Sequence, residues 1–267
     1  MPVYTGKVVV LTGASQGIGR ALVLELAQQK SRLVLAARDE AALETVAAEC
    51  RARGAETLVV PTDVAEEAAC RSLVVRAVER FGGVDVLVNN AGMGMVARLD
   101  EMHDLAAYER LMRVNYLGSV YPTYYALPHL KRSRGQIVAV SSLAGLSGVP
   151  LRTGYAATKH AQMGFFDSLR IELAHSGVSV TIVAPYFVQS QIRRRALGPD
   201  GRPLDRSPVR ESEVMTAEEC AVRIVRAMER RQRLLVMTLK GRLGRWARLV
   251  APGLVDRMAL RAVREGR

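Results

Sequence analysis

The chain has 267 residues, of which 49% are hydrophobic, and its formal net charge is +12. This size suffices for the core of one α/β domain, and no shift in composition divides residues 1–267 into two domains. No stretch reaches the roughly 18 apolar residues of a membrane-spanning helix, and no secretory signal pattern opens the chain. The three cysteines (Cys50, Cys70 and Cys220) form no CxxC pair and show no metal-ligand spacing, which excludes a disulfide framework and favours a reducing, cytoplasmic setting.

Strand-like and helix-like segments alternate along the chain. Short aliphatic runs predict strands over residues 7–11, 33–36, 57–60, 84–88, 136–140, 178–183 and 234–237. Amphipathic runs predict helices over 17–29, 39–53, 65–81, 105–131 (with an interruption at Gly118 and Pro122), 152–176 and 216–231. This alternation predicts one doubly wound parallel sheet of the Rossmann type, with about seven strands and helices on both faces.

Two segments fall outside this alternation. Residues 192–213 lack periodicity and are rich in proline, glycine and charge, so we expect a substrate lid over 191–215, with a plain connector as the alternative. The lid holds the run Arg193, Arg194 and Arg195, which is interpreted as a solvated charge run rather than as an attractor of acidic substrates.

The second segment, residues 240–267, is a basic amphipathic C-terminal extension. It holds eight basic and two acidic residues, a net +6 that is half of the total of +12. Pro252 and Gly253 predict a break into two short helices, with Leu243, Trp246 and Leu249 among the apolar residues. Two interpretations stay open: peripheral contact with an anionic membrane, or docking on the enzyme itself or a second subunit. Nucleic-acid binding is not expected, because no recognition-helix pattern is present.

A glycine-rich segment, TGASQGIG, spans residues 12–19 between the first predicted strand and the first helix. Gly13 permits a tight turn, and Gly17 and Gly19 let the backbone approach a pyrophosphate. The amino end of the helix adds free N–H groups and a partial positive charge. The segment therefore predicts a dinucleotide site.

The GxxxGxG spacing resembles that of the short-chain dehydrogenase/reductase family. The resemblance extends over about residues 7–190 through Asn89-Asn90-Ala91-Gly92 after the fourth strand and through Tyr155-x-x-x-Lys159. It implies a nicotinamide-dependent oxidoreductase acting on CH–OH and carbonyl groups, usually as a homodimer or homotetramer through the helices of 105–131 and 152–176. The cofactor-binding residues that it implies are Gly13, Ser15, Gln16, Gly17, Ile18, Gly19, Arg38, Asp63, Val64, Asn90, Ala91, Gly92, Tyr155, Lys159, Pro185, Val188 and Ser190.

The end of the second strand favours NADP(H) over NAD(H). Family members that use NAD commonly carry an acidic residue where this chain has Ala37, and Arg38 follows. A carboxylate would repel a 2′-phosphate, whereas a guanidinium binds it through charge-assisted hydrogen bonds. The alternatives are that Arg38 pairs with Glu40, or that Asp39 binds the ribose from one position later.

Tyr155 and Lys159 are four residues apart and so share one face of a helix. A phenol, with a pKa of about 10, is a poor base at neutral pH, and a neighbouring ammonium lowers that pKa. Tyr155 is thus the predicted general acid/base. By resemblance, Lys159 also binds the nicotinamide ribose, Ser142 donates to the substrate oxygen, and Asn115 holds a water that links Lys159 to solvent. The presence of all four favours an enzyme over a redox sensor or scaffold that binds NADP(H) without turnover.

The residues expected to face the substrate are apolar. A pocket lined in this way suits a small, fairly apolar ketone, aldehyde or alcohol, and hence a carbonyl reductase. The enoyl reductases of the superfamily that this chain resembles have more residues between the tyrosine and the lysine, so the spacing found here disfavours an enoyl reductase. The predicted substrate-binding residues are Met93, Leu143, Val149, Tyr186 and Phe187.

Overall fold

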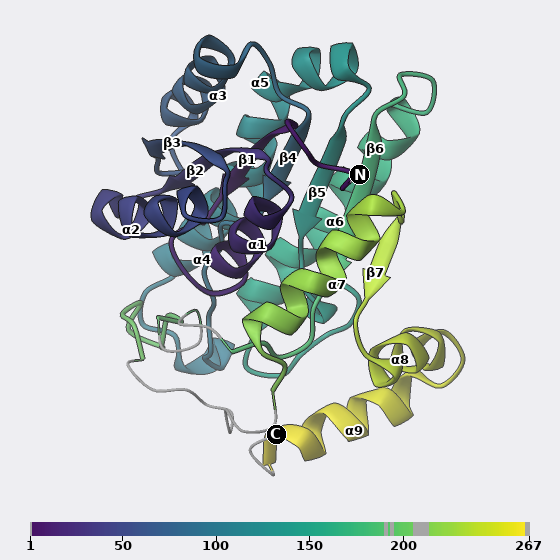
Figure 1. Cartoon of the computed structure of the whole chain (residues 1–267). Coiled ribbons are helices and arrows are strands. Elements are labelled where there is room, and N and C mark those ends of the chain that lie inside the picture. The colour runs from purple at the N-terminus through teal and green to yellow at the C-terminus, as the bar shows by residue number, and fades with distance from the viewer. Residues whose placement is uncertain (1, 190–191, 193–194, 205–213, 265–267) are drawn as a thin grey trace.

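The computed structural model describes residues 2–189, 192, 195–204 and 214–264. Its sheet has the strand order β3-β2-β1-β4-β5-β6-β7, and every neighbouring pair is parallel (Figure 1). The predicted doubly wound fold is confirmed. The order reverses between β1 and β4, and ligands of such sheets bind at the carboxyl ends of the strands at this switch point. The strands are β1 (Val8–Thr12), β2 (Arg32–Ala37), β3 (Glu56–Pro61), β4 (Val86–Asn89), β5 (Gln136–Val140), β6 (Ser179–Ala184) and β7 (Leu234–Val236).

Helices cover both faces of the sheet (Figure 1). Successive residues of β1 point to opposite faces, as the two-residue period of a strand requires: Val9 and Leu11 pack with the layer that contains α1, and Val8 and Val10 pack with the layer on the other face. One layer contains α1 (Gly17–Gln28), α2 (Glu40–Arg51) and α7 (Ala217–Glu229). The other contains α3 (Glu67–Phe81), α5 (Gly118–Ser133) and α6 (Thr153–Glu172).

The long helical region before β5 differs from its prediction. α4 (Ala106–Leu111) runs through a π-helical segment, Met112–Leu117, directly into α5. Gly118 and Pro122 therefore do not interrupt the helix, and the irregular turn lies before them. Gly118 has a packing role instead, because a Cβ there would lie 2.8 Å from Cγ2 of Val64. π-helical turns often occur at functional sites, and this one carries Asn115.

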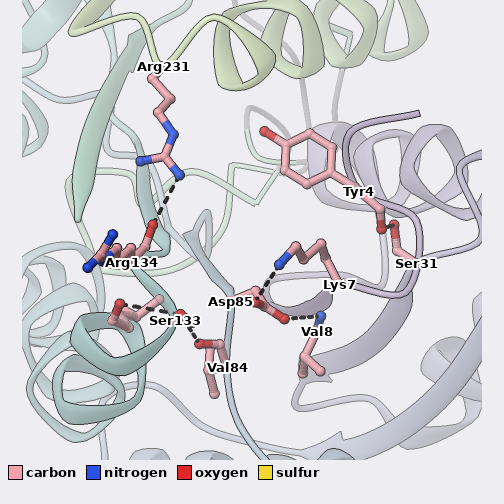
Figure 2. A network of polar contacts seen from close by, with 10 residues as sticks. Tyr4, Lys7, Val8, Ser31, Val84, Asp85, Ser133, Arg134 and Arg231 are labelled. Carbon is pink, nitrogen blue, oxygen red and sulfur yellow. Dashed lines mark hydrogen bonds and ion pairs between the residues drawn. The ribbon is translucent and has the colours of Figure 1, made fainter. Parts of the chain in front are cut away.

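Polar contacts hold together the amino ends of the strands (Figure 2). The carboxylate of Asp85 accepts a hydrogen bond from the backbone N of Val8 at 2.9 Å and pairs with Nζ of Lys7 at 3.1 Å. Arg231, after α7, donates to the backbone O of Arg134, after α5, at 3.0 Å (Figure 2). These contacts occupy the end of the sheet opposite the switch point.

The chain ends in two helices beyond β7, α8 (Leu239–Val250) and α9 (Pro252–Arg264). Figure 1 shows them in yellow at the lower edge of the molecule, on the same side as the green loop that contains residues 195–204. Within the described part of the chain, no helix combines the length and the hydropathy needed to cross a membrane.

Candidate active site

The carboxyl ends of the central strands open into a cavity of about 480 Å³. Ligand pockets usually measure roughly 300–1,000 Å³, so the cavity has the size of a small-molecule site. The glycine loop, the ends of β4 and β5, the start of α6 and residues 185–188 line it. Two residues of α9, Val255 and Ala259, complete the wall.

The glycine loop has the shape of a phosphate cradle. Gly13 and Gly17 adopt φ values of +70° and +55°, in the left-handed region where a side chain is strained. A Cβ at Gly19 would collide with the carbonyl O of Gly13, which Asn90 also binds through its side-chain N at 3.1 Å. Among the described residues, no side chain caps the amino end of α1, so its first N–H groups remain available to an anion. Ser15, Gln16 and Ile18 line the cavity beside these glycines, as do Asn90, Ala91 and Gly92.

Three of the predicted cofactor-binding residues, Arg38, Asp63 and Val64, lie outside the cavity wall, just after the ends of β2 and β3. Arg38 is exposed, and among the described residues neither Glu40 nor another carboxylate pairs with it. Asp39 caps α2 by accepting a hydrogen bond from the backbone N of Ala42 at 3.0 Å, which commits one carboxylate oxygen to the helix. Asp63 accepts from the backbone N of Ala65 at 3.0 Å, and Val64 is buried beside Gly118.

Tyr155 lies in the first turn of α6 and lines the cavity together with Ser142. Burial raises the pKa of the Tyr155 phenol, while a hydrogen bond with Ser142 and the positive charge of Arg152 act in the opposite direction. The predicted lowering of this pKa is therefore wrong, because burial outweighs the groups that favour the phenolate. The phenol is protonated at neutral pH.

Lys159 lies one helical turn after Tyr155 and is only 3% exposed. Its Nζ donates to the backbone O of Val140 at 3.1 Å and to Oε1 of Gln162 at 2.9 Å. It lies 5.7 Å from the centroid of the Tyr155 ring. Burial lowers the pKa of Lys159 from its ordinary 10.5 to about 7, so the ammonium is only partly populated at neutral pH.

Asn115 is buried in the π-helical segment. Its side chain donates to the backbone O of Met93 at 3.0 Å and to the hydroxyl of Thr158 at 2.9 Å, and it accepts from the backbone N of Met93 at 2.8 Å. Its backbone O accepts from Nε2 of Gln162 at 2.7 Å and from the Ser119 hydroxyl at 3.0 Å. The amide of Gln162, which sequence reasoning missed, therefore connects Asn115 to Lys159. The available signal was a glutamine in register with the buried face of α6.

The predicted substrate residues divide into two groups. Leu143, Val149, Tyr186 and Phe187 line the cavity, as do the predicted cofactor residues Pro185 and Val188. Met93 does not line it and packs instead against the small core cluster around Met95 and Leu111. Ser190 lies outside the described residues, as do Arg193 and Arg194.

Sequence reasoning also missed Arg152, Val255 and Ala259 as cavity residues. Arg152 precedes α6, and its Cζ lies 5.4 Å from the centroid of the Phe187 ring. The positive charge thus lies against an aromatic wall residue. No local pattern places the α9 residues in this wall, because only the tertiary fold returns the end of the chain to the switch point.

Comparison with known proteins agrees with this geometry. The short chain dehydrogenase family pattern matches residues 7–198. The chain is 37% identical over 257 residues to 11-beta-hydroxysteroid dehydrogenase A of Sesamum indicum, covering 94% of this chain and 74% of that protein. It superimposes on a short chain dehydrogenase/reductase from Burkholderia phymatum in complex with NAD with a TM-score of 0.84, at 29% identity and over 95% and 96% of the two chains. It also superimposes on an alcohol dehydrogenase from Thermococcus sibiricus complexed with 5-hydroxy-NADP with a TM-score of 0.73, at 28% identity. This superposition covers 86% of this chain and 94% of that chain. The cofactors of these two structures differ, so the likeness favours neither NAD nor NADP.

Proposed function

Because the chain belongs to the short-chain dehydrogenase/reductase family of oxidoreductases, we propose that it is an NADP(H)-dependent carbonyl reductase. It interconverts a ketone or aldehyde and the corresponding alcohol on a small, fairly apolar substrate. The observation that carries this proposal is that Ser142, Tyr155 and Lys159 line the same cavity as the glycine loop. NADPH and NADH consumption over a panel of apolar ketones and aldehydes tests it, and tight NADPH binding with no turnover on any of them favours the redox-sensor alternative.

Residues of this chain donate and accept the proton that the reaction requires. Bound NADP(H) supplies the hydride in reduction and accepts it in oxidation. During reduction, Tyr155 gives its phenolic proton to the substrate oxygen, and the Ser142 hydroxyl donates a hydrogen bond where negative charge develops. The raised pKa of Tyr155 keeps the phenol protonated at neutral pH, so this proton is present for the reduction. Solvent then returns one proton to Tyr155 for each turnover.

The preference for NADP(H) rests on Arg38. Its guanidinium is exposed and lacks a carboxylate partner among the described residues, and Asp39 is committed in part to capping α2. A guanidinium at the end of β2 that pairs with no carboxylate among the described residues can bind a 2′-phosphate.

We expect Arg38→Ala to raise the Kd for NADPH by about 10- to 100-fold, because one or more charge-assisted hydrogen bonds to the 2′-phosphate are lost. The Kd for NADH should change less than about threefold on the same argument. Fluorescence titration of both cofactors measures this. Arg32→Ala is the matched control, since Arg32 begins the same strand but pairs with Glu56 at 3.2 Å. Equal weakening of NADPH and NADH by Arg38→Ala would argue against phosphate recognition.

We propose that residues 191–215 cover the bound substrate. Ile192 lines the cavity. Leu197 exchanges backbone hydrogen bonds of 2.9 Å with Gly94 and Val96, immediately after the Asn-Asn-Ala-Gly turn. Ile192 thus extends the apolar wall of the cavity, and an apolar wall favours an apolar substrate.

A homodimer or homotetramer is part of the same proposal. The helices that the family resemblance implies as subunit contacts leave large apolar side chains exposed: Leu105 before α4, Tyr124 on α5 and Ile171 on α6. Large exposed apolar side chains on the helices that the resemblance assigns to subunit contacts support this proposal.

For the C-terminal extension we propose peripheral contact with an anionic membrane. Trp246 and Leu249 of α8 and Met258 of α9 are 64%, 71% and 63% exposed. Five arginines accompany them (Arg242, Arg245, Arg248, Arg257 and Arg261). Apolar side chains among arginines suit the interface of a bilayer with negative headgroups. Because α9 also lines the cavity, an apolar substrate dissolved in the bilayer would enter next to this contact.

Replacing Trp246 and Leu249 together by glutamate should lower co-sedimentation with phosphatidylserine-containing vesicles by at least about tenfold, because two large apolar side chains lose burial. Activity on a water-soluble ketone should not change. Leu99→Glu serves as control, because Leu99 is 61% exposed but lies before α4. Unchanged co-sedimentation of the double variant would instead support docking on a second subunit.

A further inference from the structure

The amide of Gln162 is a buried polar group to which the proposed mechanism gives no role. It is 1% exposed and lies on α6, three residues after Lys159 and on the same side of the helix. Oε1 of Gln162 accepts from Nζ of Lys159 at 2.9 Å. Nε2 donates to the backbone O of Asn115 and to the hydroxyl O of Ser119, both at 2.7 Å.

The chemistry of its partners sets the orientation of this amide. The backbone O of Asn115 can only accept a hydrogen bond, so the NH₂ group of Gln162 must face it. The carbonyl oxygen then faces Lys159, and it accepts an N–H from the amine or from the ammonium alike. One side chain thus joins α6 to the π-helical segment and to the start of α5.

This arrangement occupies the path where the family resemblance implies a water between Asn115 and Lys159. The distances from Nζ of Lys159 to Oε1 and from Nε2 to the backbone O of Asn115 are 2.9 and 2.7 Å, both direct hydrogen bonds. A water can accept one proton and release another. A side-chain amide can do so only by becoming an imidic acid, and it therefore holds its partners without conducting protons between them.

We propose that Gln162 is a positioning residue that fixes Lys159 against the cavity and closes the inner route between Lys159 and Asn115 to protons. The proposal rests on the proposed function. Each reduction moves the phenolic proton of Tyr155 to the product oxygen, and the replacement proton enters from solvent through the cavity side. Gln162 itself is neither protonated nor deprotonated in the cycle.

Few charged groups surround Lys159, so the effect of Gln162 on it can be measured. From α6 it meets Tyr155 and Gln162, and from β5 the carbonyl of Val140. Gly92, in the turn after β4, leaves the space beside Nζ open, since a Cβ there would lie 3.8 Å from it. Burial alone is the cause of its lowered pKa. The carbonyl oxygen of Gln162 favours the charged form of Lys159. Removing this oxygen should therefore lower the pKa of Lys159, and replacing the amide by a carboxylate should raise it.

The test compares Gln162→Met, which nearly keeps the volume and loses all three hydrogen bonds of the amide, with Gln162→Glu, which puts a charge beside Lys159. ¹³C NMR titration of the lysine ε-carbons in the cofactor-free full chain should place the Lys159 transition at lower pH in the Met variant and at higher pH in the Glu variant. The alkaline limb of kcat/KM for NADPH-dependent reduction should move with it, and the Met variant should lose about tenfold in kcat/KM. Gln136→Met is the matched control: Gln136 is also buried and hydrogen-bonded, but it lies at the amino end of β5.

A Lys159 titration that is the same in wild type and both variants overturns the proposal, even if the variants are less stable. Opposite shifts support it, including in a chain that shows no turnover. Absence of NADPH binding and reduction in the wild type contradicts the proposed function instead, and the cofactor-free titration still decides the role of Gln162.

Discussion

Tyr155→Phe is expected to lower kcat/KM for NADPH-dependent carbonyl reduction by about 10²- to 10⁴-fold, the usual contribution of a positioned general acid. The substitution removes only the hydroxyl, and the ring keeps its packing against the cluster around Met95 and Leu111. The Kd for NADPH, measured by fluorescence, should stay within about threefold, since Tyr155 is one of many predicted cofactor-binding residues and the others are unchanged. A lower rate with unchanged NADPH binding shows that the proton transfer is impaired, whereas a lower rate with weaker NADPH binding shows that the binding site itself is disturbed.

Tyr125→Phe supplies the control for this substitution. Its hydroxyl donates to Oε1 of Glu67 at 2.7 Å, between α5 and α3 and away from the cavity, so its loss should leave kcat/KM unchanged. Undiminished activity of Tyr155→Phe would contradict the mechanism. Because burial raises the pKa of Tyr155, the oxidation of an alcohol, which needs the phenolate, should also become faster as pH rises above neutral.

The sheet was predictable because its signal is local. Aliphatic runs such as Val8–Thr12 are buried on both faces, and each is followed by an amphipathic helix, so period and length identify them without tertiary information. The glycine loop was predictable for the same reason, since a left-handed φ at Gly13 and the close approach of Gly19 to Gly13 restrict these positions to glycine.

The residues that sequence reasoning misplaced depend on packing between distant segments. Gly118 was interpreted as a helix break, but it makes room for Val64, which is far from it in sequence. Met93 was expected to face the substrate, yet its backbone is held by Asn115 and its side chain turns to a separate core cluster. The links of Gln162 to Asn115 and Ser119 depend on the meeting of α6 with the π-helical segment, which no spacing within one segment can show.

Lys159→Met should abolish most activity and at the same time stabilise the fold. We expect a loss of at least about 10² in kcat/KM, because the group beside Tyr155 and the predicted ribose contact both disappear. We also expect a gain of about 2–3 kcal/mol in the free energy of unfolding at pH 7. Burying an amine whose pKa falls from 10.5 to about 7 costs roughly 5 kcal/mol in the protonated state, and the two lost hydrogen bonds, to Val140 and Gln162, offset about 1 kcal/mol each.

The pH dependence of this gain identifies its cause. Between about pH 7 and 10.5 the unfolded chain holds the Lys159 proton more firmly than the folded chain, so the contribution of Lys159 makes the wild type more stable as pH rises. The methionine variant lacks this contribution. Its advantage in urea unfolding should therefore be largest at pH 7 and below, shrink through pH 8 and reverse near about pH 9, where the remaining cost of deprotonating Lys159 on folding equals the roughly 2 kcal/mol of its two hydrogen bonds. Lys7→Met, at a half-exposed lysine paired with Asp85 at the other end of the sheet, is the matched control for removal of a lysine. A difference between Lys159→Met and wild type that stays constant with pH would mean that Lys159 keeps an ordinary pKa in the folded protein.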